Sequence, residues 1–214
     1  MEQYITEENE GKSFFIFIPN FLNKKELLTL KNELNEIDDW KITTKYDNIT
    51  VQRKQKWYQL NNKTFGKNWK VTHDKWKSNN YTKHLLDLQN KIQDYVNNLS
   101  CVQKTNVNSL LINYYENGNN CIAPHRDDAG SFGLEPTIIL MSVGGPRTFK
   151  IERTILDSLK RDKKMSHLNK DFILPDNSLF IMSGKSQRHF CHSIIEEPHI
   201  MNERYSLTFR EFIY

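Results

Sequence analysis

The second half of the chain is a succession of short β-rich runs, and this pattern narrows the fold more than any other feature. Six runs follow residue 106, and Gly, Pro and Asn turns separate them: VNSLLINYY, TIILMSV, RTFKIE, SLFIMS, HFCHSI and YSLTFREF. Many short strands at this spacing are typical of a β-sandwich or barrel, and a jelly roll is one such architecture. The charged stretch 152–171 interrupts the runs, and we interpret it as a solvated insertion between strands.

The first half of the chain is predicted to support this β core with helices. FFIFIP at 14–19 predicts a strand that ends at Pro19, and Asn23 with Glu26 three residues later predicts the start of a helix. Apolar residues then recur at helical spacing at Leu27, Leu30, Leu34 and Ile37. A second helix is predicted over about 81–98, with an inward face of Leu85, Leu88, Ile92, Tyr95 and Leu99. Residues 41–80 have no clear period, so we expect short strands and long loops there.

The bulk composition fits a single globular unit. The chain has 214 residues, of which 37% are hydrophobic and 12% aromatic, and this excludes the disordered class. No apolar run approaches the roughly 20 residues of a membrane span, and the charged opening MEQYITEENEGK lacks the apolar core of a signal peptide. Three cysteines, odd in number and without metal-type spacing, favour a reducing compartment. We therefore expect a soluble, intracellular monomer with no membrane partner, and the sequence leaves nucleus and cytoplasm open.

The net charge of +4 is unevenly distributed. Residues 1–40 carry 4 basic and 9 acidic side chains, or −5, whereas residues 41–91 carry 12 basic and 3 acidic side chains, or +9. A local basic excess of this kind favours a polyanionic partner such as nucleic acid. The alternative is a Lys- and Asn-rich compositional bias without functional meaning.

Two imidazoles and a carboxylate are placed so that they could share one metal ion. His125 and Asp127 are two positions apart, so on a strand both side chains point to the same face. A third ligand must come from another strand, and His189 and His192 are the candidates. Two histidines with one carboxylate suit non-haem Fe(II), whereas zinc sites usually contain Cys or a third His. The alternative is that these side chains only make hydrogen bonds.

The last strand run offers a polar wall for a second ligand. Alternate positions Arg204, Ser206, Thr208 and Arg210 share one face of RYSLTFR. Because a planar guanidinium binds a carboxylate bidentately, an arginine pair after the last metal ligand suits a dicarboxylate co-substrate. Arg210 could instead be an ordinary surface arginine of a strand.

Three segments together resemble the AlkB-like Fe(II)/2-oxoglutarate dioxygenases, which are oxidative demethylases of nucleic-acid bases. They are NYYENGNNCIAPHRDD (113–128), SLFIMSGKSQRHFCHSI (178–194) and RYSLTFR (204–210), and the similarity is nearest to the DNA-repair branch. The resemblance implies a mixed α+β fold with a mainly β core, a double-stranded β-helix (jelly roll) backed by N-terminal helices. Residues 1–105 would form an N-terminal extension with supporting helices and a nucleotide-recognition lid, and 106–214 the catalytic core, in one compact unit.

The resemblance also assigns roles at the site. It implies Fe(II), 2-oxoglutarate and O2, with His192 rather than His189 as the third ligand. Arg204 would hold the distal carboxylate of 2-oxoglutarate and Arg210 would lie near its iron-chelating end, while Asn113 and Tyr115 would hydrogen-bond the same molecule. Ser206 stands where the family prefers Asn, so it could weaken co-substrate binding or leave room for water. Tyr115 could alternatively be a core aromatic.

Most of the predicted substrate-binding residues lie in the segment RKQKWY (53–58), which resembles the family's lid. In that reading Trp57 and Tyr58 stack on a base and Arg53, with Lys54 and Lys56, meets phosphates, although Gln52 and Gln59 depart from the family pattern. Ordinary packing of the two aromatics is the alternative. Asp128 would contact the base, and the alternative is that it is a solvated acid. Arg147 and Lys150 could add contacts with the nucleic-acid backbone.

The implied reaction is removal of N-alkyl groups from DNA or RNA bases, with release of formaldehyde, succinate and CO2. A second hypothesis keeps the same oxidative machinery but directs it at a protein, lipid or small-molecule substrate. A third is a non-catalytic jelly-roll binding module.

Overall fold

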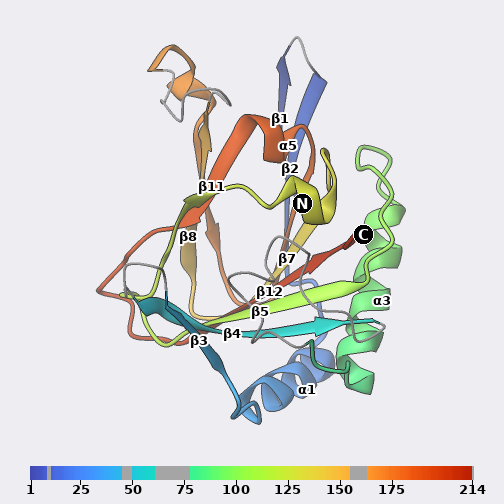
Figure 1. The fold of residues 1–214 in the computed structure, drawn as a ribbon, viewed down its shortest axis with the longest axis vertical. Helices are drawn as coiled ribbons and strands as arrows, with labels where there is room; N and C mark the ends of the chain where they lie inside the picture. Colours follow the sequence, from blue (N-terminus) through green and yellow to red (C-terminus); the bar gives the residue numbers. More distant parts are fainter. Residues whose placement is uncertain (9–10, 45–49, 61–77, 155–162, 214) are drawn as a thin grey trace.

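The computed structural model describes residues 1–8, 11–44, 50–60, 78–154 and 163–213. Two antiparallel sheets form the core of the molecule, and two helices cover the outer face of the larger one (Figure 1). The larger sheet has the strand order β1-β2-β10-β7-β12-β5-β4-β3, and the smaller has the order β6-β11-β8-β9. This mainly β jelly-roll core confirms the predicted fold class.

The bounds of the elements are as follows. The larger sheet contains β1 (Glu2–Glu8), β2 (Gly11–Pro19), β3 (Lys41–Thr44), β4 (Thr50–Gln59), β5 (Ser109–Tyr115), β7 (Ile138–Gly144), β10 (Ser178–Gly184) and β12 (Arg204–Arg210). The smaller contains β6 (Ile122–His125), β8 (Arg147–Arg153), β9 (Lys170–Leu174) and β11 (Phe190–Ile194). The helices are α1 (Lys24–Asn35), α3 (Lys83–Asn97), the short α4 (Ala129–Phe132) and α5 (Ser186–His189), and the 3-10 helix η2 (Lys163–Leu168).

The central strands of the larger sheet are buried on both faces. On β7, Ile139 and Met141 pack toward α1 and α3, whereas Ile138 and Leu140 pack toward the smaller sheet. Successive side chains of a strand point to opposite faces, so one run of apolar residues serves two cores. The second core, between the two sheets, is the one that borders the functional site.

The helices begin where the sequence predicts. Asn23 caps α1, and the reciprocal hydrogen bonds between Asn23 and Glu26 form the predicted capping box. Thr82 caps α3, whose buried face includes Leu85 and Ile92. The inward placement of Tyr95 is wrong, because this residue is 37% exposed and its ring packs edge-on against Phe21 at the rim.

The described part of residues 41–80 contains one short strand, as predicted, and one strand that is longer than predicted. The described part of this stretch includes β4, a ten-residue strand that is hydrogen-bonded to β5 in the larger sheet. The strand predicted at 14–19 is confirmed as part of β2. In the predicted insertion, β8 continues to Arg153 and β9 begins at Lys170, and residues 155–162 lie outside the described part. The division at residue 105/106 stays a prediction, and β1 to β4 share one sheet with β5.

Candidate metal and co-substrate site

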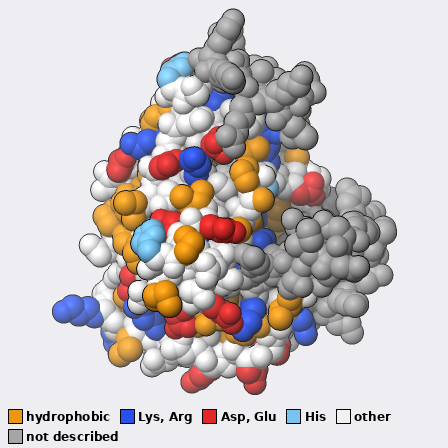
Figure 2. All heavy atoms as spheres, turned by 90° about the vertical axis from the view of Figure 1, so that its left-hand side faces the viewer, with side chains coloured by type: hydrophobic (Ala, Val, Ile, Leu, Met, Phe, Trp, Pro, Cys, Tyr) orange, Lys and Arg blue, Asp and Glu red, His pale blue; other side chains and the backbone are white. Residues whose placement is uncertain are grey.

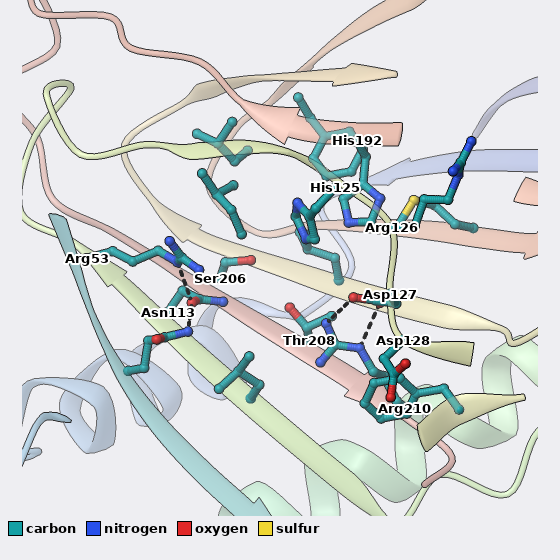
Figure 3. A pocket seen from close by; sticks show the side chains of 18 of the residues that line it. Arg53, Asn113, His125, Arg126, Asp127, Asp128, His192, Ser206, Thr208 and Arg210 are labelled. Carbon is teal, nitrogen blue, oxygen red and sulfur yellow. Dashed lines mark hydrogen bonds and ion pairs between the residues drawn. The ribbon is translucent and has the colours of Figure 1, made fainter. Parts of the chain in front are cut away.

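The three predicted metal ligands come together at one end of the space between the sheets. His192 on β11 lies directly opposite His125 on β6 in the strand register, and their ring centroids are 4.2 Å apart. Asp127 follows β6 by two residues. One ligand atom from each of these three residues lies within 4.8 Å of the others (Figure 3). Two imidazoles and one carboxylate at this spacing can hold a single divalent ion on one face.

Both imidazoles are held in the neutral form that metal binding requires. Burial, and after it the neighbouring imidazole of His125, lower the pKa of His192 to about 3. Burial also lowers the pKa of His125. The Nδ1 atom of His125 lies 2.9 Å from the carbonyl oxygen of Ala123, and donation to that oxygen leaves Nε2 with a lone pair for a metal.

Asp127 is ionised and oriented by an arginine. Arg210 donates from Nε to Oδ2 over 2.8 Å and from Nη2 to Oδ1 over 3.1 Å, which is a bidentate ion pair between two buried side chains. Burial raises the pKa of Asp127, but the charge of Arg210 and its hydrogen bonds outweigh this effect, so the pKa falls to about 2. This contact excludes the alternative in which Arg210 is a surface arginine.

A cavity of about 170 Å³ adjoins the triad. Five of the six residues predicted to bind the co-substrate line it together with the triad: Asn113, Tyr115, Ser206, Thr208 and Arg210. His189, the other candidate ligand, is buried elsewhere, with its Nδ1 atom 3.1 Å from Glu8 Oε1. The two histidines of this segment therefore face different surroundings.

The amide of Asn113 has a fixed orientation in the cavity wall. Arg53 Nε donates to its Oδ1 atom over 2.9 Å, and Gln55 Nε2 donates to the same atom over 2.8 Å (Figure 3). Two donors at the oxygen leave the amide nitrogen to donate to a ligand. Gln55 was not among the site residues predicted from the sequence, although its position two residues after Arg53 places it on the same strand face.

Arg204 is the sixth predicted residue, and it lies behind the cavity wall. Its guanidinium is 0% exposed, and the guanidinium carbon is 5.3 Å from the centroid of the Tyr115 ring. Nε donates to Ser142 Oγ over 2.9 Å, but Nη1 and Nη2 make no hydrogen bond of standard geometry within the described residues. Burial lowers the pKa of Arg204 to about 10, and the Tyr115 hydroxyl offsets part of this effect. A buried fork with two unused nitrogens is suited to a ligand carboxylate.

Comparison with known proteins identifies the family. The model of the 2OG-Fe(II) oxygenase superfamily matches residues 14–210. The chain belongs to this superfamily. It is AlkB-like within it, because it is 28% identical over 211 residues to human alpha-ketoglutarate-dependent dioxygenase alkB homolog 3, covering 94% of this chain and 66% of the relative. It is 30% identical over 116 residues to the DNA oxidative demethylase ALKBH2 of Arabidopsis thaliana, covering 48% of this chain and 37% of the relative.

Solved structures share the fold at low sequence identity. OsALKBH1 matches with a TM-score of 0.59 at 13% identity, covering 92% of this chain and 97% of the other. A 2OG-Fe(II) oxygenase family protein from Burkholderia pseudomallei matches with a TM-score of 0.60 at 12% identity, covering 92% and 84%. Membership of the superfamily implies Fe(II), 2-oxoglutarate and O2. The triad fits Fe(II), and the two nitrogens of Arg204 without a hydrogen bond of standard geometry fit a carboxylate of 2-oxoglutarate.

Charged side chains outside the metal triad also line the oxygenase cavity. Asp128 accepts hydrogen bonds from Ser131 Oγ over 2.6 Å and from the Gly130 backbone N–H over 3.3 Å. Asp128 and Arg53 both line the cavity. Both side chains are therefore held where they can meet a ligand that enters toward the triad.

The two aromatics of the lid segment pack inside the protein. Trp57 is 2% exposed and belongs to an apolar cluster with Phe132 and Phe212, and Tyr58 is 4% exposed in the core under the helices. In this arrangement neither ring is open to a base, which favours the packing alternative. Side chains of β4 alternate, so Arg53 lines the cavity while Lys54 and Lys56 form ion pairs with Glu116 and Asp39.

The prediction that Arg147 contacts a nucleic-acid backbone is wrong. This side chain is 1% exposed, and it donates to Glu197 and to backbone carbonyl oxygens of two loops, those of Asn117, Gly118, Asn120 and Ile195. Arg147, Phe149 and Ile151 share the inward face of β8, so strand alternation was the signal that its side chain is buried. Arg147 ties the β5–β6 loop to the β11–β12 loop.

The basic excess of residues 41–91 is only partly within the described structure. Six of its twelve cations lie outside the described residues: Lys45, Lys63, Lys67, Lys70, Lys75 and Lys77. On the face shown in Figure 2, basic and acidic side chains are interspersed with hydrophobic ones over the described surface. None of the described helices is long and apolar enough to cross a membrane.

Proposed function

We propose that this AlkB-like oxygenase removes N-alkyl groups from bases of DNA or RNA, with formaldehyde, succinate and CO2 as further products. The observation that carries the proposal is that Arg53 and Asp128 line the same cavity as the metal triad. The edge of a nucleobase offers donors and acceptors together. A carboxylate can accept from an exocyclic amine while a guanidinium donates to a carbonyl or phosphate oxygen.

The relatives support the same substrate class. The Arabidopsis relative is named a DNA oxidative demethylase, and the human relative is similar over nearly the whole of this chain. A base in a duplex must leave the stack before its methyl group can enter such a cavity, whereas a base in a single strand is already accessible.

The described side chains divide the work of this reaction. When bound, Fe(II) and 2-oxoglutarate supply with O2 the oxidation of the N-alkyl group. His125, Asp127 and His192 would hold the metal, and Arg210 keeps Asp127 ionised and oriented. Arg204 would bind the distal carboxylate of the co-substrate through its two unused nitrogens, and the amide nitrogen of Asn113 would donate to the same molecule. The protein thus supplies geometry and charge, and the cofactors supply the oxidation.

The test is formaldehyde release from a panel of methylated oligonucleotides. The protein is purified anaerobically with Fe(II) and is then given 2-oxoglutarate, O2 and single-stranded or duplex oligonucleotides that carry different methylated bases. We expect formaldehyde above background on at least one methylated base, and stimulation of 2-oxoglutarate turnover that weakens at raised salt. Equal background on every oligonucleotide would overturn the proposal and favour a protein, lipid or small-molecule substrate.

A further inference from the structure

The carboxylate of the metal triad lies on a segment that no strand pairing holds. His125 and His192 face each other in the register of β6 and β11. Residues 126–128, between β6 and α4, belong to no strand or helix. A ligand on an irregular segment must be held by side chains if its geometry is to be set before the metal binds. Asp127 therefore depends on contacts from outside its own segment.

Two such contacts fix Asp127 from opposite ends. Arg210 holds the carboxylate, as described above. The backbone N–H of Asp127 donates to Oε1 of Gln187 over 3.0 Å. Gln187 is buried and belongs to α5, 60 residues further along the chain. Its amide takes the place that a neighbouring strand would have in a sheet.

The anchor itself is well fixed. Nε2 of Gln187 points at Sδ of Met182 over 3.5 Å, which leaves Oε1 for the Asp127 N–H. The helix α5 packs against β2 and β10, and the Lys185 backbone N–H just before it donates to the Lys12 carbonyl over 2.9 Å. Because α5 runs directly into β11, Gln187 joins Asp127 to the strand that carries His192.

We propose that Gln187 is a positioning residue that sets the Asp127 carboxylate relative to the two imidazoles. Loss of a group that orients a metal ligand typically weakens metal binding about 10- to 100-fold. The inference concerns metal affinity alone, so it stands or fails independently of the nucleic-acid substrate proposed above.

Three variants of the full chain test it. Gln187→Met keeps the length of the side chain but removes the acceptor, and Gln187→Glu keeps an acceptor oxygen. Ser186→Ala is the control, because this buried hydroxyl on the same helix has no hydrogen-bond partner within the described residues. The metal-free proteins are titrated anaerobically with Co(II) followed by visible absorption, and their thermal midpoints are measured without metal.

We expect Gln187→Met to bind Co(II) about 10- to 100-fold more weakly and Ser186→Ala to stay close to the parent protein, with Gln187→Glu binding more tightly than Gln187→Met because it keeps the acceptor. A merely structural role would instead lower the metal-free thermal midpoint and leave the Co(II) affinity unchanged. If Gln187→Met does not fold, Gln187→Asn replaces it, since its amide is one methylene too short to reach Asp127. Parent-like affinity in the acceptor-free variant, or equal loss in all three variants, would overturn the inference.

Discussion

Strand β12 has a buried arginine at each end, and only one of the two forms an ion pair with an acidic side chain of the described residues. Arg210 and Arg204 are both buried on one strand. The guanidinium of Arg210 is matched by the carboxylate of Asp127 through two hydrogen bonds. The guanidinium of Arg204 has one hydrogen bond, to Ser142, and no acidic partner joined to it by an ion pair within the described residues. One arginine therefore completes the protein's own metal site, and the other is left for a ligand.

The two arginines should therefore affect different properties: Arg210 the stability of the metal-free protein, and Arg204 the binding of a ligand. A buried charge destabilises a fold unless it is paired and hydrogen-bonded, and removal of one member of a buried pair leaves the other uncompensated. In the metal-free protein Arg210 should therefore contribute to stability, whereas Arg204 should reduce it. A dicarboxylate that binds near Arg204 would reverse the penalty at that end of the strand.

Arg210→Met should give the largest effect. It leaves Asp127 buried without its partner, so we expect the free energy of unfolding of the metal-free protein to fall by about 3–5 kcal/mol. Co(II) affinity should fall as well, because the pKa of Asp127 rises and its orientation is lost. Urea unfolding and a Co(II) titration measure the two effects. A variant as stable as the parent would show that the Arg210–Asp127 pair is not a structural contact in solution.

Arg204→Met should weaken the binding of 2-oxoglutarate without lowering the stability of the metal-free protein. We expect 2-oxoglutarate to bind at least about 100-fold more weakly, since two charge-assisted hydrogen bonds of about 1.5–3 kcal/mol each are lost. The metal-free protein should be as stable as the parent or more stable. Calorimetric titration with Fe(II) replaced by an inert divalent ion measures the affinity. Arg204→Lys is the matched control, because it keeps the charge without the planar fork. Unchanged affinity in the Met variant would contradict the role of Arg204.

Acidification should destabilise the metal-free protein through the triad. His192 has a pKa near 6.5 when unfolded and about 3 when folded, so below pH 6.5 the unfolded chain binds the extra proton. As the pH is lowered below 6.5, the free energy of unfolding therefore decreases by about 1.4 kcal/mol per pH unit, or by about 2 kcal/mol at pH 5. The lowered pKa of Asp127 adds a further loss only below about pH 3.8. His192→Gln should flatten this dependence, and His199→Gln, at an exposed position, should not. Parallel curves for all three proteins would contradict the pKa shift of His192.

Ser206→Asn should have the smallest effect. Ser206 lines the cavity and lies opposite Asn113 in the strand register. A longer side chain with an added donor should tighten 2-oxoglutarate binding by up to about tenfold, which corresponds to one hydrogen bond of about 0.5–1.5 kcal/mol. Ser206→Ala, which adds no donor, is the comparison, and the same calorimetric titration measures both. Weaker binding by the Asn variant would show that the space beside Ser206 is needed by the co-substrate or by water.

The sequence predicted the β core because its signals there are local. The two-residue spacing of His125 and Asp127 predicted that both lie on one strand face, but β6 ends at His125 and Asp127 follows it. The pairing of β6 with β11 brings His192 opposite His125. The choice of His192 over His189 did not follow from spacing and came from the family resemblance. The structure places His189 beside Glu8 of β1, a contact between positions far apart in the chain.

The substrate side was harder to predict, for physical reasons. β4 lacks a binary pattern because its cavity face carries Arg53 and Gln55, while Trp57 and Tyr58 are both buried. A strand that lines a polar cavity violates the apolar alternation by which strands are found. Gln187 carries no spacing signal at all, because its contact with Asp127 exists only after α5 has packed beside the metal site.

His125, Asp127 and His192 are expected to hold one ferrous ion beside a 2-oxo acid. The most direct measurement is anaerobic visible absorption of the protein with Fe(II) and 2-oxoglutarate, where chelation of the metal by a 2-oxo acid gives a charge-transfer band. We predict a band that saturates at one iron per chain and is absent in His125→Ala and His192→Ala. It should remain in His189→Gln. A band that persists without His192, or that disappears only when His189 is changed, would contradict the account.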